Sequence, residues 1–374
     1  MADFLYIHIP FCLRKCLYCD FLSVPYDASS AGHYLDALCR ELELKKDKSG
    51  ILRSIYIGGG TPTTLSEKHF RKLFECVRNN YVLSSDAEIT VEANPGSLDR
   101  TKIDTILSFG VNRLSVGVQS FHDNELNVLG RVHSADDAQR SLALIQKSGI
   151  ENFSIDLMYG IPGQDLTSWL ESLAKAAEFS PMHISAYELT PEQNTPFFHL
   201  LNSNRIEMPD DDQIFTMYSF GIDYLESRGY AQYEISNFAF RDYECRHNLN
   251  YWDRGEYLGA GAGAHSFLNN MRSKNTGDIR QYIEELASGS IPVREPLRLT
   301  PEDSLRELLF LGLRKKQGIR LNKSAIFPEN GVELCRELID EGFLEIYGDS
   351  MRLTRKGVPV SNAVIVNLFG KFGL

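Results

Sequence analysis

The first half of the chain alternates short β-rich segments with longer segments of helical apolar spacing, and this alternation limits the possible folds strongly. Parallel neighbouring strands need long crossover connections, so strands that alternate with helices predict a parallel sheet. The segments predicted as strands are residues 4–9, 53–59, 88–95, 113–120, 152–160 and 183–190. The clearest helical patterns between them cover residues 33–44, 67–80 and 135–149, and the candidate N-caps are Ser66, Ser134 and Asp165.

Right-handed crossovers curl such a sheet into a βα barrel or part of one. We therefore expect an α/β fold with a partial barrel of six βα units. Several strands end in polar or glycine-rich residues, as in "GGGTP", "EANP" and "GVQS". Because the carboxyl ends of barrel strands form the active site, this edge of the sheet is predicted to be the functional face.

The pattern changes after about residue 200, and we expect three parts. Residues 1–200 form the βα barrel, and residues 201–298 form an extension rich in aromatic residues and glycine, with a helix near 210–228. Residues 299–374 contain two helical segments, 301–316 and 330–343, followed by a hairpin with Gly348 and Asp349 at its turn. Helices followed by a hairpin predict a small winged-helix-like domain.

Composition excludes several classes of protein. A net charge of −11 over 374 residues argues against a nucleic-acid binder, which usually presents a basic face. No apolar run approaches the ~20 residues that span a bilayer, and the N-terminus lacks the pattern of a signal peptide. We therefore expect a cytoplasmic protein without disulfides. Four scattered cysteines are predicted to be small buried side chains: Cys39, Cys76, Cys245 and Cys335.

Three further cysteines lie together just after the first predicted strand. Cys12, Cys16 and Cys19 have the spacing C-x3-C-x2-C, which lets three thiolates bind one metal centre. A structural zinc site needs four ligands, and His8 is the only nearby candidate for the fourth. A 4Fe–4S cluster is usually held by four cysteines, so three would leave one iron open to an external ligand. The spacing favours the cluster over zinc and over three incidentally packed cysteines.

The segment "CLRKCLYC", followed by "GGGTP" after the second strand, resembles the radical S-adenosylmethionine (SAM) superfamily. The resemblance implies a partial βα barrel in which SAM binds the open iron of the cluster. Five motifs in order, "YIHIPFC", "GGGTPT", "SVGVQSF", "IDLMYGIPGQ" and "RHNLNYW", resemble the family of anaerobic coproporphyrinogen oxidases (HemN) and heme chaperones (HemW).

The resemblance also implies a set of SAM-binding residues, most of them at strand ends. Alternatives from the residues alone remain, since Glu92 also suits a turn cap and Arg131 a surface ion pair. Gln119 and Asp156 lie on apolar strands, where an unpaired polar group is costly. The predicted SAM residues are Tyr6, Phe21, Gly59, Gly60, Thr61, Glu92, Gln119, Arg131 and Asp156.

Two departures from the oxidase pattern favour the chaperone branch. In the oxidases the motif continues to a further cysteine two residues after the third, where this chain has Phe21. The oxidases also carry a substantial segment ahead of the cluster motif, whereas eleven residues precede Cys12 here. Both features resemble the HemW pattern.

The segment "CRHNLNYW" is the candidate heme contact. His247 suits an axial ligand and Cys245 is a softer candidate, while Tyr251 and Trp252 offer flat apolar area. The alternative is a structural turn in which His247 bonds to the backbone. Three arginines suit heme propionates, although a solvated surface role fits each equally well: Arg241, Arg246 and Arg254.

We therefore predict a heme chaperone that binds heme, a 4Fe–4S cluster and SAM, and transfers heme to apo-acceptor proteins such as membrane respiratory enzymes. It is expected to bind no nucleic acid and to have no membrane span, and a homodimer is possible on this reading. Whether it is also an enzyme is left open. The alternatives are an oxygen-independent coproporphyrinogen III oxidase and a radical SAM enzyme that acts on another substrate.

Overall fold

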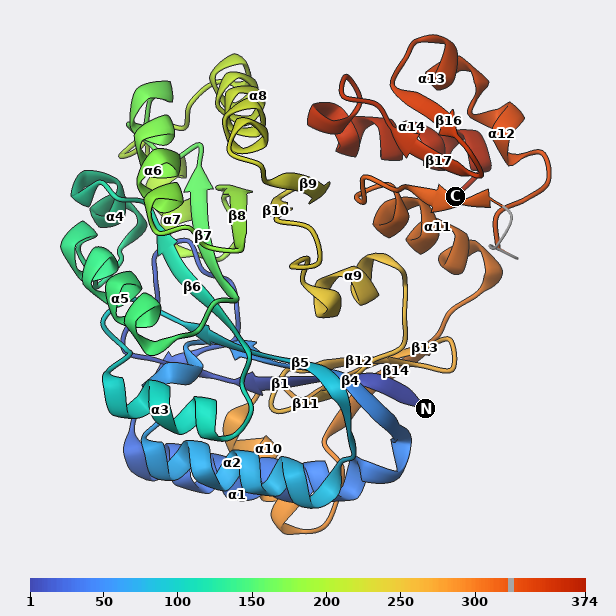
Figure 1. Ribbon diagram of the computed structural model, residues 1–374. Helices are drawn as coiled ribbons and strands as arrows, with labels where there is room; N and C mark the ends of the chain where they lie inside the picture. Colours follow the sequence, from blue (N-terminus) through green and yellow to red (C-terminus); the bar gives the residue numbers. More distant parts are fainter. Residues whose placement is uncertain (322–325) are drawn as a thin grey trace.

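A nine-stranded sheet forms the centre of the computed structural model, which describes residues 1–321 and 326–374 (Figure 1). The strand order is β11-β1-β4-β5-β6-β7-β8-β10-β9, and the pairs from β11 to β8 are parallel. The six predicted strands are β1 (Ala2–Ile9), β4 (Ser49–Gly59), β5 (Leu83–Ala93), β6 (Arg113–Gln119), β7 (Phe153–Tyr159) and β8 (His183–Glu188). The predicted α/β fold with a partial βα barrel is confirmed.

Helices cover the outer face of the curved sheet, as Figure 1 shows for α1, α2, α3 and α5. The helices are α1 (Ala28–Lys45), α2 (Glu67–Asn80), α3 (Arg100–Ser108), α4 (Asp123–Leu129), α5 (Ala135–Ser148) and α6 (Leu166–Glu178). The predicted N-caps are confirmed, because Ser66, Ser134 and Asp165 each accept a hydrogen bond from the backbone N–H three residues later.

Side-chain alternation along β6 separates the core from the barrel interior. Leu114, Val116 and Val118 are fully buried in the hydrophobic core. The residues between them line an internal cavity: Arg113, Ser115, Gly117 and Gln119. Since successive side chains of a strand point to opposite faces, this alternation places small and polar groups inside the barrel.

The segment after residue 200 contributes to both edges of the sheet. β9 (Ala231–Glu234) and β10 (Asn237–Ala239) extend it beyond β8 in antiparallel pairing, while β11 (Leu258–Ala260) pairs in parallel with β1 at the other edge. α7 (Pro196–Asn202) spans the start of this segment. The segment itself forms α8 (Asp211–Ser227), α9 (Arg246–Trp252), α10 (Ile279–Ala287) and the small antiparallel sheet of β12 (His265–Leu268), β13 (Met271–Asn275) and β14 (Val293–Arg298). The helix expected near 210–228 is therefore present as α8.

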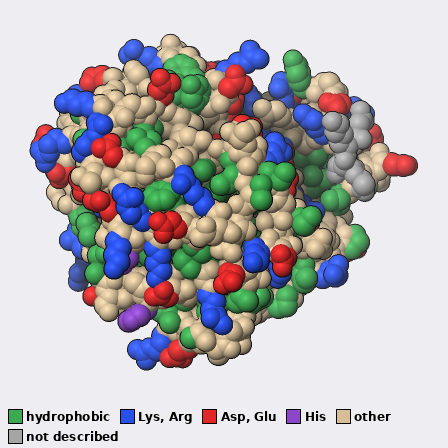
Figure 2. Space-filling view, turned by 60° about the horizontal axis from the view of Figure 1, so that its bottom comes forward, with side chains coloured by type: hydrophobic (Ala, Val, Ile, Leu, Met, Phe, Trp, Pro, Cys, Tyr) green, Lys and Arg blue, Asp and Glu red, His purple; other side chains and the backbone are tan. Residues whose placement is uncertain are grey.

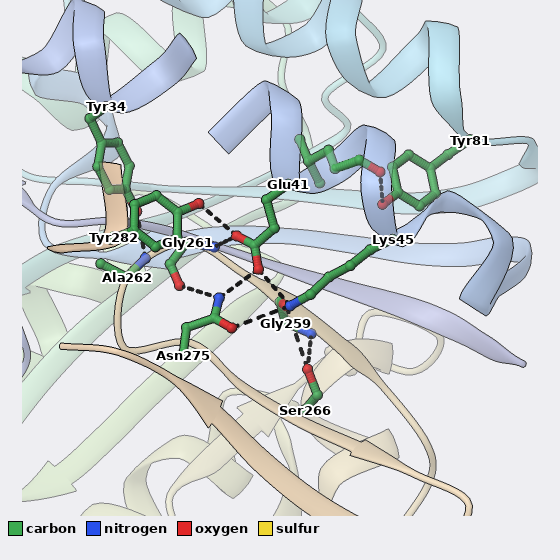
Figure 3. A network of polar contacts seen from close by, with 11 residues as sticks. Tyr34, Glu41, Lys45, Tyr81, Gly259, Gly261, Ala262, Ser266, Asn275 and Tyr282 are labelled. Atoms are coloured by element: carbon green, nitrogen blue, oxygen red, sulfur yellow. Dashed lines mark hydrogen bonds and ion pairs between the residues drawn. The ribbon is translucent and has the colours of Figure 1, made fainter. Parts of the chain in front are cut away.

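A buried polar network ties this segment to the barrel (Figure 3). The carboxylate of Glu41 on α1 forms an ion pair of 2.5 Å with Lys45 and accepts hydrogen bonds from the backbone N–H of Gly261 and the hydroxyl of Tyr282. The Asn275 amide donates to Glu41 and accepts from Lys45. Because α1 belongs to the barrel while the other partners follow residue 258, these contacts join distant parts of the chain.

The C-terminal part is a small lobe on one side of the barrel (Figure 1). It comprises α11 (Pro301–Gly312), β15 (Ile319–Arg320), α12 (Gly331–Leu334), α13 (Arg336–Asp340), β16 (Leu344–Tyr347), β17 (Ser350–Leu353) and α14 (Ser361–Phe372). The predicted hairpin is present, with Gly348 at a φ of 61° in its turn. The helix expected over 330–343 is two short helices that meet at Cys335, and α14 was not predicted.

Two general expectations concern the whole molecule. No helix among the described residues is long and apolar enough to cross a membrane. On the face shown in Figure 2, Lys and Arg side chains are interspersed with Asp and Glu.

Candidate functional site: a cysteine-lined cavity inside the barrel

A cavity of about 530 Å³ lies inside the barrel and reaches the carboxyl ends of its strands. Of the predicted cluster and SAM residues, all except Tyr6 line it. These are Cys12, Cys16, Cys19, Phe21, Gly59, Gly60, Thr61, Glu92, Gln119, Arg131 and Asp156. The strand topology therefore brings together residues that lie up to 144 positions apart in the sequence. The Tyr6 hydroxyl instead lies 3.0 Å from Nδ1 of His8, beside this cavity.

The cysteine loop begins directly after β1. Its ends are tied together by β2 (Phe11–Cys12) and β3 (Val24–Pro25), which pair in parallel. The Cys19 N–H donates to the Cys16 carbonyl at 3.3 Å, and the Thr61 hydroxyl donates to Sγ of Cys12 at 3.5 Å. All three thiols are free and partly exposed to the cavity. Burial raises the pKa of Cys19 to about 11 and that of Cys12 above its ordinary value, so these thiols are protonated at neutral pH until a metal displaces the protons.

The donor set fits an iron–sulfur cluster better than a zinc ion. Within residues 1–321 and 326–374, no three His, Cys, Asp or Glu side chains converge on a point that a single ion would occupy. Cysteines that bind different irons of a cubane need not converge, because each ligates its own corner of the cluster. His8 is also engaged, with Nδ1 3.0 Å from the Tyr6 hydroxyl and Nε2 2.9 Å from the Leu22 carbonyl. The predicted zinc alternative with His8 as fourth ligand is therefore not favoured.

The glycine segment after β4 packs directly on the cysteine loop. The Gly60 N–H donates to the Ile9 carbonyl at 2.9 Å, and the Thr61 N–H donates to the Phe11 carbonyl at 2.7 Å. A Cβ on Gly60 would lie 2.7 Å from the Phe11 oxygen, closer than real contacts allow. Gly59 has a φ of 109°, a conformation that L side chains rarely adopt. Gly60 is thus required by the approach of the cysteine loop, and Gly59 by its backbone conformation and by the His8 side chain beside it.

Glu92 is the penultimate residue of β5, and its carboxylate lines the cavity. It accepts from the Tyr56 hydroxyl at 2.7 Å and from the Gly59 N–H at 3.1 Å. The turn that follows β5 is instead capped by Ser97, whose hydroxyl accepts from the Asn94 N–H. Burial raises the pKa of Glu92 to about 7. The geometry therefore supports a site role for Glu92 over the turn-cap alternative.

Arg131 is buried beside the cysteines and makes no ion pair with any described residue. Its Nη2 donates to Oδ1 of Asn94 at 2.7 Å and to the Gly117 carbonyl at 2.5 Å, while Nη1 lies 3.3 Å from Sγ of Cys16. Its Nε finds no hydrogen-bond partner in the described part of the chain. A buried cation with an unused donor beside the cluster ligands suits an incoming carboxylate.

Gln119 and Asp156 occupy neighbouring strands on the same side of the cavity. Gln119 has a φ of 69°, in the left-handed region that non-glycine residues seldom adopt, where strain often marks a functional site. Asp156 accepts hydrogen bonds from the hydroxyls of Ser115, Ser154 and Ser185 at 2.9, 2.9 and 2.7 Å. Asp156 is therefore held in place by serines of the barrel, and Gln119 is set apart by its backbone conformation.

The predicted heme residues do not reach this cavity. His247 is 0% exposed, and its Nδ1 lies 3.0 Å from the Ser54 hydroxyl while Nε2 lies 2.9 Å from the Tyr251 hydroxyl. Burial, helped by the charge of Arg113, lowers the pKa of His247 to about 3. Both ring nitrogens are thus engaged, so His247 offers no free nitrogen to heme iron in this conformation. An axial role for His247 stays a prediction that requires this helix to move, and Cys245 is equally buried.

The arginines named for heme propionates have different surroundings. Arg246 contacts Asp86 and Arg254 pairs with Glu307 at 2.8 Å, whereas the Arg241 side chain is 94% exposed. Of the lone cysteines, Cys245 and Cys335 are buried as expected, whereas Cys39 and Cys76 are only partly buried.

Sequence reasoning missed several residues that line the cavity, among them Tyr56, Asn94, Arg113, Ser185 and Asn248. The spacing of Arg113 could have indicated its position, because it lies two positions before Ser115 and four before Gly117, and alternate residues of a strand share a face.

A curled parallel sheet that holds three clustered cysteines and a glycine segment at its carboxyl edge defines a radical SAM protein. Residues 6–176 match the family described as the radical SAM superfamily, and residues 299–360 match the HemN C-terminal domain. The chain is 38% identical to the heme chaperone HemW of Bacillus subtilis (strain 168) over 98% of both chains. It is 42% identical to HemW of Escherichia coli (strain K12) over 70% of this chain and 69% of that protein. The chain belongs to the HemW family.

One solved structure shares the fold over nearly the whole length. Coproporphyrinogen III oxidase (HemN) from Escherichia coli superposes with a TM-score of 0.83, covers 98% of this chain and 90% of that chain, and is 23% identical. At this identity the likeness describes the architecture of barrel and C-terminal lobe.

Proposed function

We propose that this protein is a cytoplasmic heme chaperone that binds heme, a 4Fe–4S cluster and SAM, and passes heme to apo-acceptor proteins. The observation that carries the proposal is the full-length similarity to proteins named heme chaperone HemW, at 38% and 36% identity over 98% of this chain. Three free thiols that must bind iron also suit a reducing compartment. Membrane respiratory enzymes are the proposed acceptors, and a homodimer is the proposed assembly.

The cluster is assigned to Cys12, Cys16 and Cys19, and SAM to the cavity residues around Glu92, Arg131 and Asp156. A reduced cluster, when bound, supplies the electron that cleaves SAM. The chain's own contribution is to fix the Cys12 thiol against Thr61 and to surround the rest of the cavity with packed strands. Arg131 supplies a buried cation, and Tyr56 orients the carboxylate of Glu92.

We place heme in a second cavity of about 660 Å³, between α9 and the C-terminal lobe. This volume is within the ~300–1,000 Å³ range of small-molecule sites. Its walls combine apolar side chains with cations, the chemistry that a flat macrocycle with two carboxylates requires: Leu249, Trp252, Leu308, Ile319, Lys315 and Arg320. Asp253 also lines the cavity and pairs with Lys315, so a heme carboxylate would compete with it for this cation. The Trp252 Nε1 atom is buried and has no hydrogen-bond partner among the described residues. On this proposal the residues of the motif H-N-x-x-Y-W have two roles. His247 and Tyr251 fix α9 to the barrel, whereas Trp252 contacts heme.

An oxygen-independent coproporphyrinogen III oxidase is the second candidate, and the fold likeness to HemN is the observation that favours it. The lower identity of 23% and Phe21 in place of a further cysteine weigh against it.

The test is a heme-transfer assay with two acceptors. Heme-loaded protein is mixed anaerobically with an apo respiratory heme protein and, separately, with apomyoglobin, and the acceptor Soret bands are followed. Transfer to the respiratory acceptor that is faster than from free heme supports the proposal. Transfer to neither acceptor, together with anaerobic formation of protoporphyrinogen from coproporphyrinogen, would instead establish the oxidase.

A further inference from the structure

Arg113 is a buried arginine inside the barrel whose guanidinium has no hydrogen-bond partner among the described residues. It is 2% exposed, yet it lines the cavity together with Ser115 and Tyr56. Its Nε atom is unpartnered, and none of the hydrogen bonds or ion pairs within residues 1–321 and 326–374 involves its guanidinium. Buried polar groups are nearly always hydrogen-bonded, and a guanidinium carries five donors in a fixed fork. This side chain therefore lacks a ligand that supplies acceptors.

The carboxylates around Arg113 are occupied by other donors. Glu88 accepts from the backbone N–H groups of Arg246 and His247 at 3.0 and 3.1 Å, at the start of α9. Asp156 is held by three serine hydroxyls, and Glu92 by Tyr56 and Gly59. Burial opposes the charge of Arg113, while the neighbouring Cys245 and Glu88 raise its pKa above the ordinary value. These surroundings keep the guanidinium charged and leave its hydrogen-bonding edge unused.

Arg113 also lies far from the cluster end of the cavity. Arg113, Ser115, Gly117 and Gln119 alternate along β6 and all line the same space. Six residues of strand at ~3.3 Å each separate the first from the last by roughly 20 Å. The cysteines and Arg131 are at the carboxyl end, so Arg113 belongs to the deep end of the cavity, away from the cluster ligands. Glu92 and Asp156 lie between the two ends, and the charge of Arg113 reaches Glu92.

We propose that the deep end of the barrel cavity binds a carboxylate through Arg113, with the amide of Asn248 beside it. A carboxylate matches a guanidinium in shape and charge, because two parallel N–H···O bonds join them. This chemistry has two possible sources: a small free organic acid, or a propionate arm of a tetrapyrrole that enters the barrel. The first goes beyond the proposed function, and the second rests on it.

The test compares carboxylates with neutral analogues of the same size. Cluster-loaded protein is titrated anaerobically by calorimetry with propionate and with propionamide, and by fluorescence with protoporphyrin IX and with its dimethyl ester. Each titration is run on wild type, on Arg113→Gln and on Arg100→Gln. Arg100 is an exposed arginine on α3, outside the cavity, and its replacement removes the same charge.

The proposal predicts that wild type and Arg100→Gln bind one or both carboxylates in preference to the amide or ester, and that Arg113→Gln binds about 10- to 100-fold more weakly. A preference for propionate that is lost in Arg113→Gln indicates a small acid, and a preference for protoporphyrin over its ester that is lost in Arg113→Gln indicates a tetrapyrrole arm. Equal binding by wild type and Arg113→Gln would overturn the assignment. It would indicate instead that the carboxylate binds elsewhere, for example at the open iron of the cluster. Absence of any carboxylate preference in wild type would overturn it as well.

Two safeguards keep the result interpretable. If Arg113→Gln does not fold, Arg113→Lys takes its place, because it keeps the buried cation and loses the paired N–H donors of the guanidinium. Weaker carboxylate binding by this variant, with an unchanged circular dichroism spectrum, supports recognition by the guanidinium. Heme binding that is unaffected by Arg113→Gln would overturn the tetrapyrrole arm while the chaperone proposal stands. A wild type that binds no heme would count against the chaperone, and the propionate titration would still decide the role of Arg113.

Discussion

His247 and Tyr251 hold each other from successive turns of α9, with Nε2 of the histidine 2.9 Å from the tyrosine hydroxyl. The other ring nitrogen lies 3.0 Å from the hydroxyl of Ser54 on β4. The hydrogen bond between His247 and Ser54 thereby fixes α9 to the barrel. In this conformation the motif H-N-x-x-Y-W anchors a helix between the barrel and the C-terminal lobe.

This anchor makes stability depend on pH in a definite direction. The folded pKa of His247 is lowered to about 3, below the 6.5 of an ordinary histidine, so the unfolded state binds the proton more tightly. The contribution of His247 is complete above pH 6.5 and is lost as pH falls toward 3, at up to about 1.4 kcal/mol per pH unit. In urea titrations at several pH values, His247→Gln should reduce this slope. Parallel slopes in variant and wild type would contradict the account.

We expect the cysteine loop to supply all the ligands that the protein provides to the cluster. Replacing Cys12, Cys16 and Cys19 together with Ala should abolish the broad visible absorption after anaerobic reconstitution, along with bound iron and sulfide. Cys76→Ala is the matched control, because its thiol is free but lies between α1 and α2, outside the barrel cavity. Full iron and sulfide content in the triple variant would remove these residues as ligands.

The contact between the glycine segment and the cysteine loop gives a sterically defined prediction. A methyl group on Gly60 would lie 2.7 Å from the Phe11 carbonyl, so Gly60→Ala should displace the loop and lower the iron bound per chain by half or more. Gly277→Ala is the control, since a Cβ there meets no atom within 4 Å. Iron content is measured by colorimetric assay after reconstitution. Equal iron in the two variants would show that the loop tolerates the displacement.

The network around Glu41 should contribute strongly to stability. Glu41 is fully buried and holds Lys45, Asn275, Tyr282 and the Gly261 N–H together. Glu41→Ala leaves the Lys45 charge buried without its partner, so the free energy of unfolding should fall by about 3–5 kcal/mol. Glu284→Ala serves as the control, because no ion pair of the described residues involves that side chain. A loss under 1 kcal/mol for Glu41→Ala would mean that the network relaxes around the change.

The sheet and most of the cavity could be predicted from the sequence because both follow from local spacing. Alternation along β6 and polar residues near strand ends are enough to place Gln119 and Glu92 at one edge of the sheet, whereas Asp156 faces the same cavity from the middle of β7. β11 was not predicted, because three residues carry little periodicity and their pairing of Leu258 with Leu5 spans much of the chain. The burial of His247 was also missed, since a motif gives residue types and not the direction in which a helix faces.

The C-terminal half illustrates the same limit. The hairpin of β16 and β17 was predicted from its local turn. By contrast, α14 is formed by an apolar stretch with several β-branched residues, and such a stretch resembles a strand as much as a helix. Its helical form depends on packing against α11 and α12, which local spacing does not encode.

The central claim, that this chain binds heme, is tested most directly by an anaerobic heme titration of the cluster-reconstituted protein, followed at the Soret band. The account predicts saturation near one heme per chain and weaker binding, by about tenfold, in Trp252→Ala and Lys315→Gln. His247→Ala distinguishes a ligand from an anchor, because loss of the Soret maximum with unchanged cluster content would make His247 axial after a movement of α9. No saturable heme binding by the wild-type protein would contradict the account.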